Sequence, residues 1–217
     1  MFGKGAKNKP DFIKKRAVLK IADHPTQVIL SDKVMGRAIA FIQDSMSDPD
    51  SRILVHCASG ISRSVSMVLA YLISEHKDIT NVDDALAFVR KNRPQANPNL
   101  GFRFQLDQFT ESKCDLTSAR KKYLALMKND DTNPILISIK QRAEASEIMR
   151  ILLDIEGSIV EKEEKDVLSD LGKRIDNIIA KMNSSVCCDR PAMSIIKSAK
   201  SKYKSILRKR SENVFAQ

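Results

Sequence analysis

The sequence predicts an α/β fold, in which helices flank a central sheet, followed by a helical C-terminal extension. Two short runs of apolar and β-branched residues are typical of strands, and several segments around them have helical spacing. After about Cys114 the character changes, because residues 135–190 contain no Pro and only two Gly. These observations predict a first domain at residues 11–113 and a mostly helical, basic extension at residues 114–217.

The bulk composition suits a globular chain. Its 217 residues are 42% apolar and 29% charged, which argues against wholesale disorder and fits one domain with an extension or two small domains. No apolar run approaches the ~20 residues of a membrane span. The basic N-terminus has no apolar segment behind it, which argues against a signal peptide. We therefore expect a cytoplasmic chain, with the nucleus as the alternative.

The predicted strands and first helix lie before residue 58. Residues 16–23 are a short strand candidate that runs into a turn. Residues 30–46 have a helical pattern that Ser31 can cap. After the turn "SDPDS", the apolar run "RILVHC" at residues 52–57 reads as a buried strand.

Three further helices are expected before residue 113. Residues 62–77 are largely apolar, so this helix is expected to be central. Residues 80–94 form the next, with a cap at Thr80 or Asn81 and a stop at Pro94. Residues 97–112 form the third.

The extension has the spacing of long amphipathic helices. The apolar residues of the first two step by three and four, in the sets Ile148, Leu152, Ile155, Ile159 and Leu168, Leu171, Ile175, Ile178, Met182. This favours an intramolecular helix pair, with self-association as the alternative. Residues 193–210 form a basic amphipathic helix whose apolar face comprises Ile196, Ala199, Tyr203 and Ile206.

The most informative segment is "HCASGISRS", at residues 56–64. A strand is expected to end at Cys57 and a helix to begin near Arg63, so the intervening N–H groups and the helix N-terminus can bind an anion. Gly60 allows a left-handed conformation or a close backbone approach. Arg63 can hold two phosphate oxygens in a bidentate fork. The predicted phosphate-binding residues are Ala58, Ser59, Gly60, Ile61, Ser62 and Arg63.

The same segment predicts a reactive thiolate at Cys57. Inward N–H groups and a guanidinium stabilise the thiolate over the thiol. Ser64 can donate a hydrogen bond to the sulfur, and His56 can orient the loop through its ring N–H groups. A buried Cys after a strand is ordinarily a small apolar residue, but the register of His, Cys, Gly, Arg and Ser favours the catalytic interpretation.

These residues resemble the H-C-x-x-G-x-x-R-[ST] signature of cysteine-dependent protein tyrosine phosphatases. The segments "AYLI" at residues 70–73 and "DALAFVRKNRPQANPNLGFRFQLDQF" at residues 84–109 resemble the dual-specificity branch. The resemblance covers residues 16–109. It implies a phosphatase-like fold and hydrolysis of phosphotyrosine, phosphoserine and phosphothreonine on proteins through a phosphocysteine. It also implies that no metal or other cofactor takes part.

The resemblance further implies a general acid, an Asp upstream of the Cys between a short strand and a helix. Asp23, 34 residues before Cys57, has that place. Asn99 resembles a family position that braces the loop, although an Asn near a helix start is also an ordinary cap. The rival acids are Asp32, Asp44, Asp48 and Asp50.

The sequence departs from the family ahead of Asp23, where family domains usually carry a recognition hairpin and further strands. This predicts an incomplete sheet, which the C-terminal helices either compensate for or leave poorly folded. The alternative function is therefore a weak or inactive phosphate-binding scaffold whose helical tail binds partners. The uncharged loop residues Ala58, Ser59, Ile61 and Ser62 favour a phosphoprotein over an inositol lipid as substrate.

Charge suggests the remaining partners. The formal net charge is +10, with seven Lys and Arg against one Asp in residues 1–20 and eight against none in residues 190–210. Such ends are either simply solvated or bind acidic partners. The basic C-terminal helix suits an anionic membrane surface, a partner groove or a nuclear address. The four cysteines include no C-x-x-C pair, and Cys187 and Cys188 have no assigned role.

Overall fold

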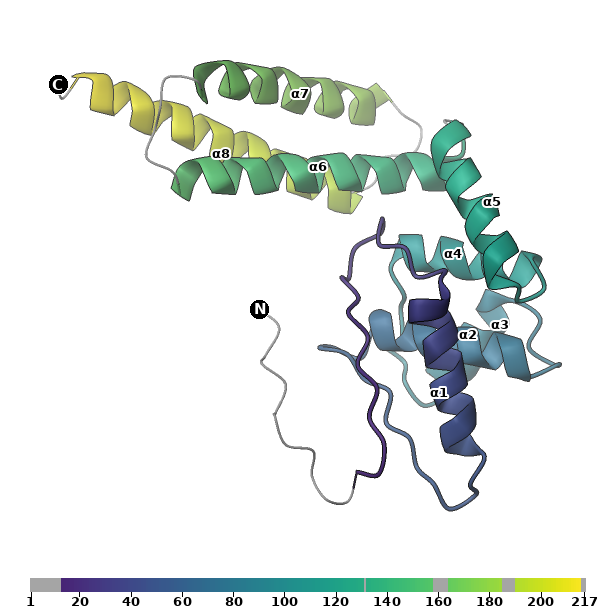
Figure 1. The fold of residues 1–217 in the computed structure, drawn as a ribbon. Coiled ribbons are helices and arrows are strands. Elements are labelled where there is room, and N and C mark those ends of the chain that lie inside the picture. Colours follow the sequence, from purple (N-terminus) through teal and green to yellow (C-terminus); the bar gives the residue numbers. More distant parts are fainter. Residues whose placement is uncertain (1–12, 131, 158–163, 185–189, 216–217) are drawn as a thin grey trace. The chain divides into compact units, whose positions relative to one another are not determined.

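The computed structural model describes residues 13–130, 132–157, 164–184 and 190–215, which form two compact units (Figure 1). The first unit comprises residues up to Asp23 and Gln27–Lys121. The second comprises His24–Thr26 and Lys122–Gln217. The predicted boundary after residue 113 falls at a turn in which Lys113 and Cys114 have left-handed φ values of 51° and 63°. The division into the two predicted domains stays a prediction.

The helices of the first unit follow the predicted order. A π-helical turn at Asp32–Gly36 leads into α1 (Arg37–Met46), and α2 (Arg63–Glu75), α3 (Val82–Arg90) and α4 (Leu100–Glu111) follow. The side chain of Asn81 caps α3 by accepting from the N–H of Asp84. Ser31 stands at the predicted N-cap before the π turn but makes no side-chain cap hydrogen bond.

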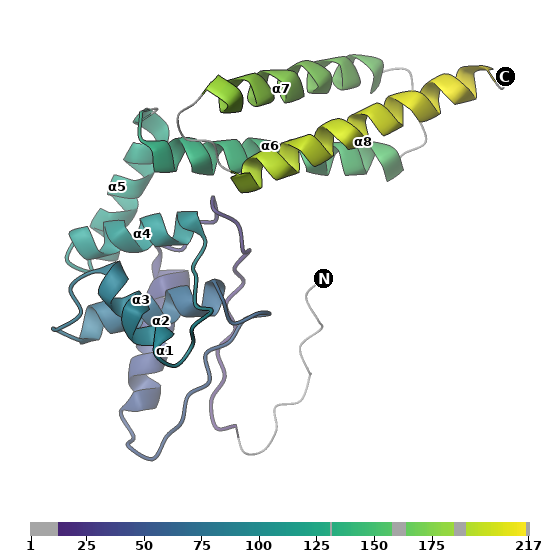
Figure 2. The same cartoon turned by 180° about the vertical axis from the view of Figure 1, so that it is seen from behind.

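Helix α2 is central to the first unit, as its apolar sequence predicts. It packs against α1, α3 and α4, and these helices surround it in both ribbon views (Figures 1 and 2). Leu69 and Ala70 are fully buried on α2, and so are Phe102 and Leu106 on α4. Because burial of each large apolar side chain contributes ~1.5–3 kcal/mol, this packing fixes the start of α2, which directly follows residues 57–62.

The predicted α/β fold with a central sheet is wrong, because none of the described residues forms a β-strand. Residues 16–23 and 52–57 are non-helical, but they do not pair as a ladder with each other or with another described segment. A strand is stabilised by hydrogen bonds to a neighbouring strand, and apolar composition cannot supply that neighbour. Leu54, expected inside a sheet, is instead 82% exposed.

Helix α5 (Leu116–Asn129) spans the division between the units, and the second unit continues with α6 (Pro134–Gly157), α7 (Glu164–Ser184) and α8 (Arg190–Phe215). The three long helices pack on one another around a common core. The predicted apolar stripes supply it: Ile148, Leu152 and Ile155 from α6, Leu168, Leu171, Ile175, Ile178 and Met182 from α7, and Ile196, Ala199 and Ile206 from α8. The expected intramolecular packing of α6 and α7 is confirmed, and α8 completes the bundle.

Several predictions about the extension remain untested. Ile159, Cys187, Cys188 and the basic tail at residues 1–10 lie outside the described residues. Self-association, membrane binding and an acidic partner stay predictions. Among the described helices, none combines the length and apolar character needed to cross a membrane.

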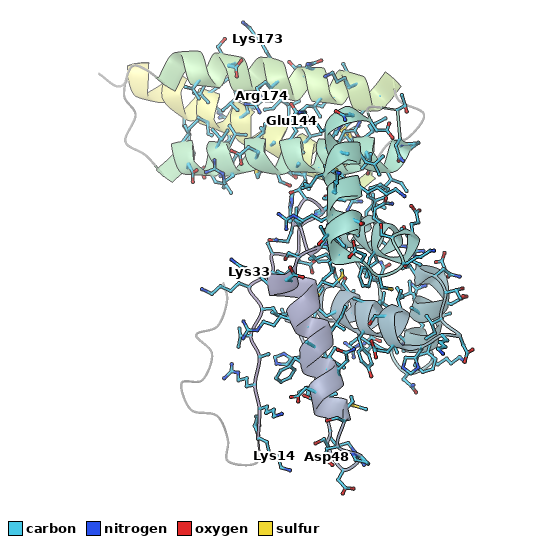
Figure 3. The ribbon with its side chains drawn as sticks, turned by 45° about the vertical axis from the view of Figure 1, so that its right-hand side comes forward. Lys14, Lys33, Asp48, Glu144, Lys173 and Arg174 are labelled. Carbon is cyan, nitrogen blue, oxygen red and sulfur yellow. The ribbon has the colours of Figure 1, made fainter. Side chains whose placement is uncertain are left out.

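Charged side chains cover the outside of both units. In Figure 3, Lys173 lies on the outer side of α7, and Lys14 and Asp48 lie at the same end of the first unit. The N–H of Asp50 is the main cause of a lowered Asp48 pKa, to which the hydroxyl of Ser51 and the charge of Lys14 also contribute. Lys200 of α8 bonds Asp176 of α7 at 2.8 Å, so part of the basic charge of α8 is paired within the bundle.

Candidate active site

The candidate site forms where an extended segment meets α2. Residues 52–57 lead to Cys57, the chain turns through residues 58–62, and the helix begins at Arg63. Gly60 has a φ of +63°, the left-handed conformation for which a glycine was expected. Ser62 is the N-cap residue of α2, but its hydroxyl is used elsewhere, as described below.

The sulfur of Cys57 lies inside this turn and accepts two hydrogen bonds. The N–H of Gly60 and the hydroxyl of Ser64 both donate to Sγ at 3.3 Å. Ser64 is buried on the first turn of α2, so its hydroxyl is held in place by the helix. The expected contact between Ser64 and Cys57 is therefore present.

These contacts favour the thiolate. Burial raises the pKa of Cys57 and is the largest single influence. The Ser64 hydroxyl and the backbone N–H groups of Ser64, Ser59 and Gly60 together outweigh it, and they lower the pKa from 9.0 to about 6. By contrast, burial, assisted by the charge of Glu75, raises the pKa of Cys114. The two cysteines are therefore expected to differ strongly in reactivity near neutral pH.

Asp23 lies against the same turn. Its Oδ1 accepts a hydrogen bond of 2.7 Å from the hydroxyl of Ser62 and one of 2.9 Å from Nδ2 of Asn99. Its Oδ2 lies 3.6 Å from Nε of Arg63, an ion pair rather than a hydrogen bond. Tertiary structure thus brings Asp23, Arg63 and Asn99 together from three distant parts of the sequence.

Asn99 has two structural roles. Its Oδ1 caps α4 by accepting from the N–H of Phe102, while its Nδ2 reaches Asp23. Its own N–H donates to the hydroxyl oxygen of Ser62 at 3.1 Å. The predicted helix cap is present, and the side chain also contacts Asp23, whereas the contact with the loop at Ser62 is made by the backbone N–H. The bracing role of Asn99 stays a prediction.

Ser59 joins this network only through its backbone, and the side chains of the remaining predicted residues take no comparable part. His56 is exposed, and within the described part of the chain its ring makes no hydrogen bond to the loop. Ala58, Ser59 and Ile61 are exposed. Of the rival acids, Asp44 pairs with Lys15 at 2.6 Å, and Asp48 accepts hydrogen bonds within its own turn.

Two residues that the sequence analysis did not single out contact this region. Arg93 donates to the carbonyl oxygens of Ser59 and Gly60. The fully buried amide of Gln105 accepts from the N–H of Ile29 and donates to the carbonyl of Gln27, in the segment that follows Asp23. No local pattern marks either residue, because their partners lie more than thirty positions away. The described residues hold no cluster of three or more His, Cys, Asp and Glu side chains suited to a metal ion.

Comparison with known proteins finds similarity over the same region. Residues 6–112 match the family described as "Dual specificity phosphatase, catalytic domain". Dual specificity protein phosphatase 2 of Mus musculus is 46% identical over 71 residues, which cover 33% of this chain and 21% of that protein. Dual specificity protein phosphatase 22-B of Danio rerio is 41% identical over 90 residues, covering 41% and 45%. Mpk3 of Drosophila melanogaster, another dual specificity protein phosphatase, is 44% identical over 91 residues, covering 42% and 21%. The chain thus spans less than half the length of these relatives.

Proposed function

Because the chain belongs, through residues 6–112, to the dual specificity phosphatase family, we propose that it hydrolyses phosphate monoesters on Tyr, Ser and Thr side chains of proteins through a phosphocysteine. The observation that carries this proposal is the environment of Cys57. Its sulfur accepts hydrogen bonds from Gly60 and Ser64, and its pKa of about 6 makes it largely a thiolate at neutral pH.

In the first proposed step, the thiolate of Cys57 attacks phosphorus and the bond from phosphorus to the side-chain oxygen breaks. The loop N–H groups and the guanidinium of Arg63 hold the three remaining phosphate oxygens, whose negative charge they stabilise. Asp23 protonates the departing oxygen, which leaves as the hydroxyl of the dephosphorylated side chain. The sulfur ends this step bonded to phosphorus.

In the second step, water attacks the phosphocysteine, and the carboxylate of Asp23 accepts its proton. The products are inorganic phosphate and the regenerated thiolate. The hydroxyl of Ser64, 3.3 Å from the sulfur, stabilises the negative charge that returns to Cys57 as the bond to phosphorus breaks. Asp23 ends the cycle protonated and ready for another substrate.

The ion pair between Asp23 and Arg63 implies an exchange of partners on substrate binding. In the structure Nε of Arg63 faces Oδ2 of Asp23 at 3.6 Å. A phosphate dianion in the loop competes with this carboxylate for the guanidinium. We infer that Arg63 turns to the phosphate and that the carboxyl group of Asp23, no longer paired with the guanidinium, carries the proton that it donates in the first step. The bonds from Ser62 and Asn99 keep Asp23 beside the loop.

The chemical class of the substrate follows from the uncharged loop. Ala58, Ser59 and Ile61 are exposed beside Cys57 and carry no cation that would bind a second phosphate on a polyphosphorylated lipid headgroup. The proposal therefore commits to phosphoproteins, with inositol phosphates as the comparison substrate in the test.

The test is the release of inorganic phosphate from phosphotyrosyl and phosphothreonyl peptides by the purified full chain. Wild type is compared with Cys57→Ser, which replaces one sulfur by oxygen and removes the thiolate. We expect turnover only from wild type, and retention of peptide binding by the variant. No turnover above that of Cys57→Ser would contradict the proposal and favour the scaffold interpretation. A preference for inositol phosphates would contradict the proposed substrate class.

A further inference from the structure

The outer side of the phosphate loop is held by residues 93–97. Nη2 of Arg93 donates to the carbonyl of Ser59 at 3.0 Å, and its Nε donates to the carbonyl of Gly60 at 3.2 Å. The N–H of Asn97 donates to the carbonyl of Ile61 at 2.9 Å. Three consecutive carbonyl groups of the loop therefore point toward this segment.

Because peptide units are planar, the outward direction of these carbonyl groups also sets the direction of the N–H groups inside the loop. In a trans peptide unit the C=O and the next N–H point in opposite directions, and no described peptide bond is cis. The unit that joins Ser59 to Gly60 shows the result, because its carbonyl meets Arg93 while its N–H meets the sulfur of Cys57. By the same geometry, the N–H groups of Ile61 and Ser62 face away from residues 93–97.

The supporting segment is itself fixed. Nε of Arg90 donates to the carbonyl of Ala96 at 2.9 Å, and the N–H of Ala96 donates to the carbonyl of Arg93 at 2.9 Å. Ala96 is fully buried. Rotating the side-chain amide of Gln95 places its oxygen 2.8 Å from Nη1, 3.1 Å from Nη2 and 3.2 Å from Nε of Arg93, so Gln95 can also hold the guanidinium. Arg93 therefore has a defined position although it is exposed.

We infer that Arg93 is a positioning residue for the phosphate loop: its guanidinium holds the carbonyls of Ser59 and Gly60 outward, so that the following N–H groups face the sulfur and a bound phosphate. Arg93 itself binds the carbonyls on the outer side of the loop and not the sulfur of Cys57. The phosphate part of the inference rests on the proposed function. The part that concerns the sulfur of Cys57 stands on the described hydrogen bonds alone.

The role needs an arginine rather than any cation. Two adjacent carbonyls are bound by two different nitrogens of one planar group, whereas the single nitrogen of a Lys side chain cannot reproduce this fixed fork. Gly60 permits the approach, because a Cβ at this position would lie 2.7 Å from Nη2 of Arg93. The glycine and the arginine thus form a matched pair across the loop.

The test compares Arg93→Met, Arg93→Lys and the matched control Lys91→Met in the full chain. Lys91 is an exposed cation two positions away, so its replacement by Met removes one positive charge, as the replacement of Arg93 does. Its ammonium lies 5.9 Å from the ring centroid of Phe88. Two quantities are measured: the pH midpoint of iodoacetamide alkylation at Cys57, and the protection of Cys57 by inorganic phosphate. Thermal unfolding checks that each variant is folded.

We expect Arg93→Met and Arg93→Lys both to move the alkylation midpoint to higher pH and to raise the phosphate concentration needed for protection, by about tenfold for Arg93→Met. Lys91→Met should match wild type in both. Wild-type values in Arg93→Met would overturn the inference. So would full recovery in Arg93→Lys, because charge alone would then suffice. If Arg93→Met fails to fold, the Lys variant decides the question.

These measurements are separate from the test of the proposed function. Absence of peptide turnover by wild type would contradict that function while leaving the alkylation midpoints to decide the role of Arg93. Conversely, turnover that depends on Cys57 could be observed even if replacement of Arg93 had no effect on either quantity.

Discussion

Replacement of Ser64 by Ala removes one hydrogen bond to the sulfur of Cys57 and leaves the loop sequence otherwise intact. The hydroxyl donates to Sγ at 3.3 Å and is the strongest of the influences that lower the pKa of Cys57 to about 6. A hydrogen bond to a charged group contributes ~1.5–3 kcal/mol, which corresponds to ~1–2 pKa units. We therefore expect the pKa of Cys57 in Ser64→Ala to be roughly 7–8.

The sign and size of the effect on reactivity follow from the thiolate fraction. With a pKa of about 6, half of the Cys57 side chains are ionised at pH 6 and most at pH 7. At pH 6, raising the pKa by ~1–2 units lowers that fraction roughly five- to fiftyfold. At pH 9 both proteins are largely ionised, so their rates should converge. The higher intrinsic nucleophilicity of the less acidic thiol offsets part of the loss.

The assay is alkylation by iodoacetamide from pH 5 to pH 9, followed by peptide-resolved mass spectrometry. Cys114 is an internal reference, because burial raises the pKa of its thiol and it should react only at higher pH. Ser66→Ala is the matched control, since its hydroxyl donates to the carbonyl of Ser62 rather than to the sulfur. An unchanged midpoint in folded Ser64→Ala would refute the argument that the hydroxyl stabilises the thiolate.

Three further predictions concern the acid, the loop and the bundle. Asp23→Ala should lower kcat about 10²–10⁴-fold for an alkyl phosphate, whose leaving oxygen needs a proton, and much less for p-nitrophenyl phosphate; equal losses on both substrates would contradict the assignment of Asp23 as acid. Gly60→Ala should destabilise the protein by ~1–2 kcal/mol in denaturant unfolding, because its φ of +63° is strained for a residue with a Cβ; wild-type stability would mean that the loop adopts another conformation. Leu152→Ala should lower stability by ~2–5 kcal/mol, because Leu152 is fully buried in the bundle core. The neighbouring Leu153, 52% exposed, supplies the control Leu153→Ala, and equal thermal unfolding of the two variants would contradict the described packing.

The helices were predictable because their signals are local. Asn81 caps α3 through Asp84, three residues away, and the three-and-four spacing of Leu168, Leu171 and Ile175 places these side chains on one face of α7. The contact of Ser64 with Cys57 was also predictable, since it joins two residues only seven positions apart across a single loop. Such interactions depend on residues that lie close together in the sequence.

The sheet was not predictable in this way. The residues "RILVHC" have strand composition, but β-structure requires a second segment at hydrogen-bonding distance, and none of the described residues provides one. The residues that contact the loop from outside were equally unpredictable from the sequence. Arg93 meets Ser59 and Gly60 across more than thirty positions, and nothing in the residues near it indicates that contact.

By itself, the sequence determined the order of the helices, the left-handed turn at Gly60 and the pairing of Ser64 with Cys57, because backbone geometry and short-range spacing suffice for each. Only the tertiary structure decided that residues 52–57 stay unpaired, that Ser62 and Asn99 hold Asp23 beside Arg63, and that Arg93 supports the loop from outside. The physical reason is that these features depend on which distant segments α2 and α4 bring together when they pack.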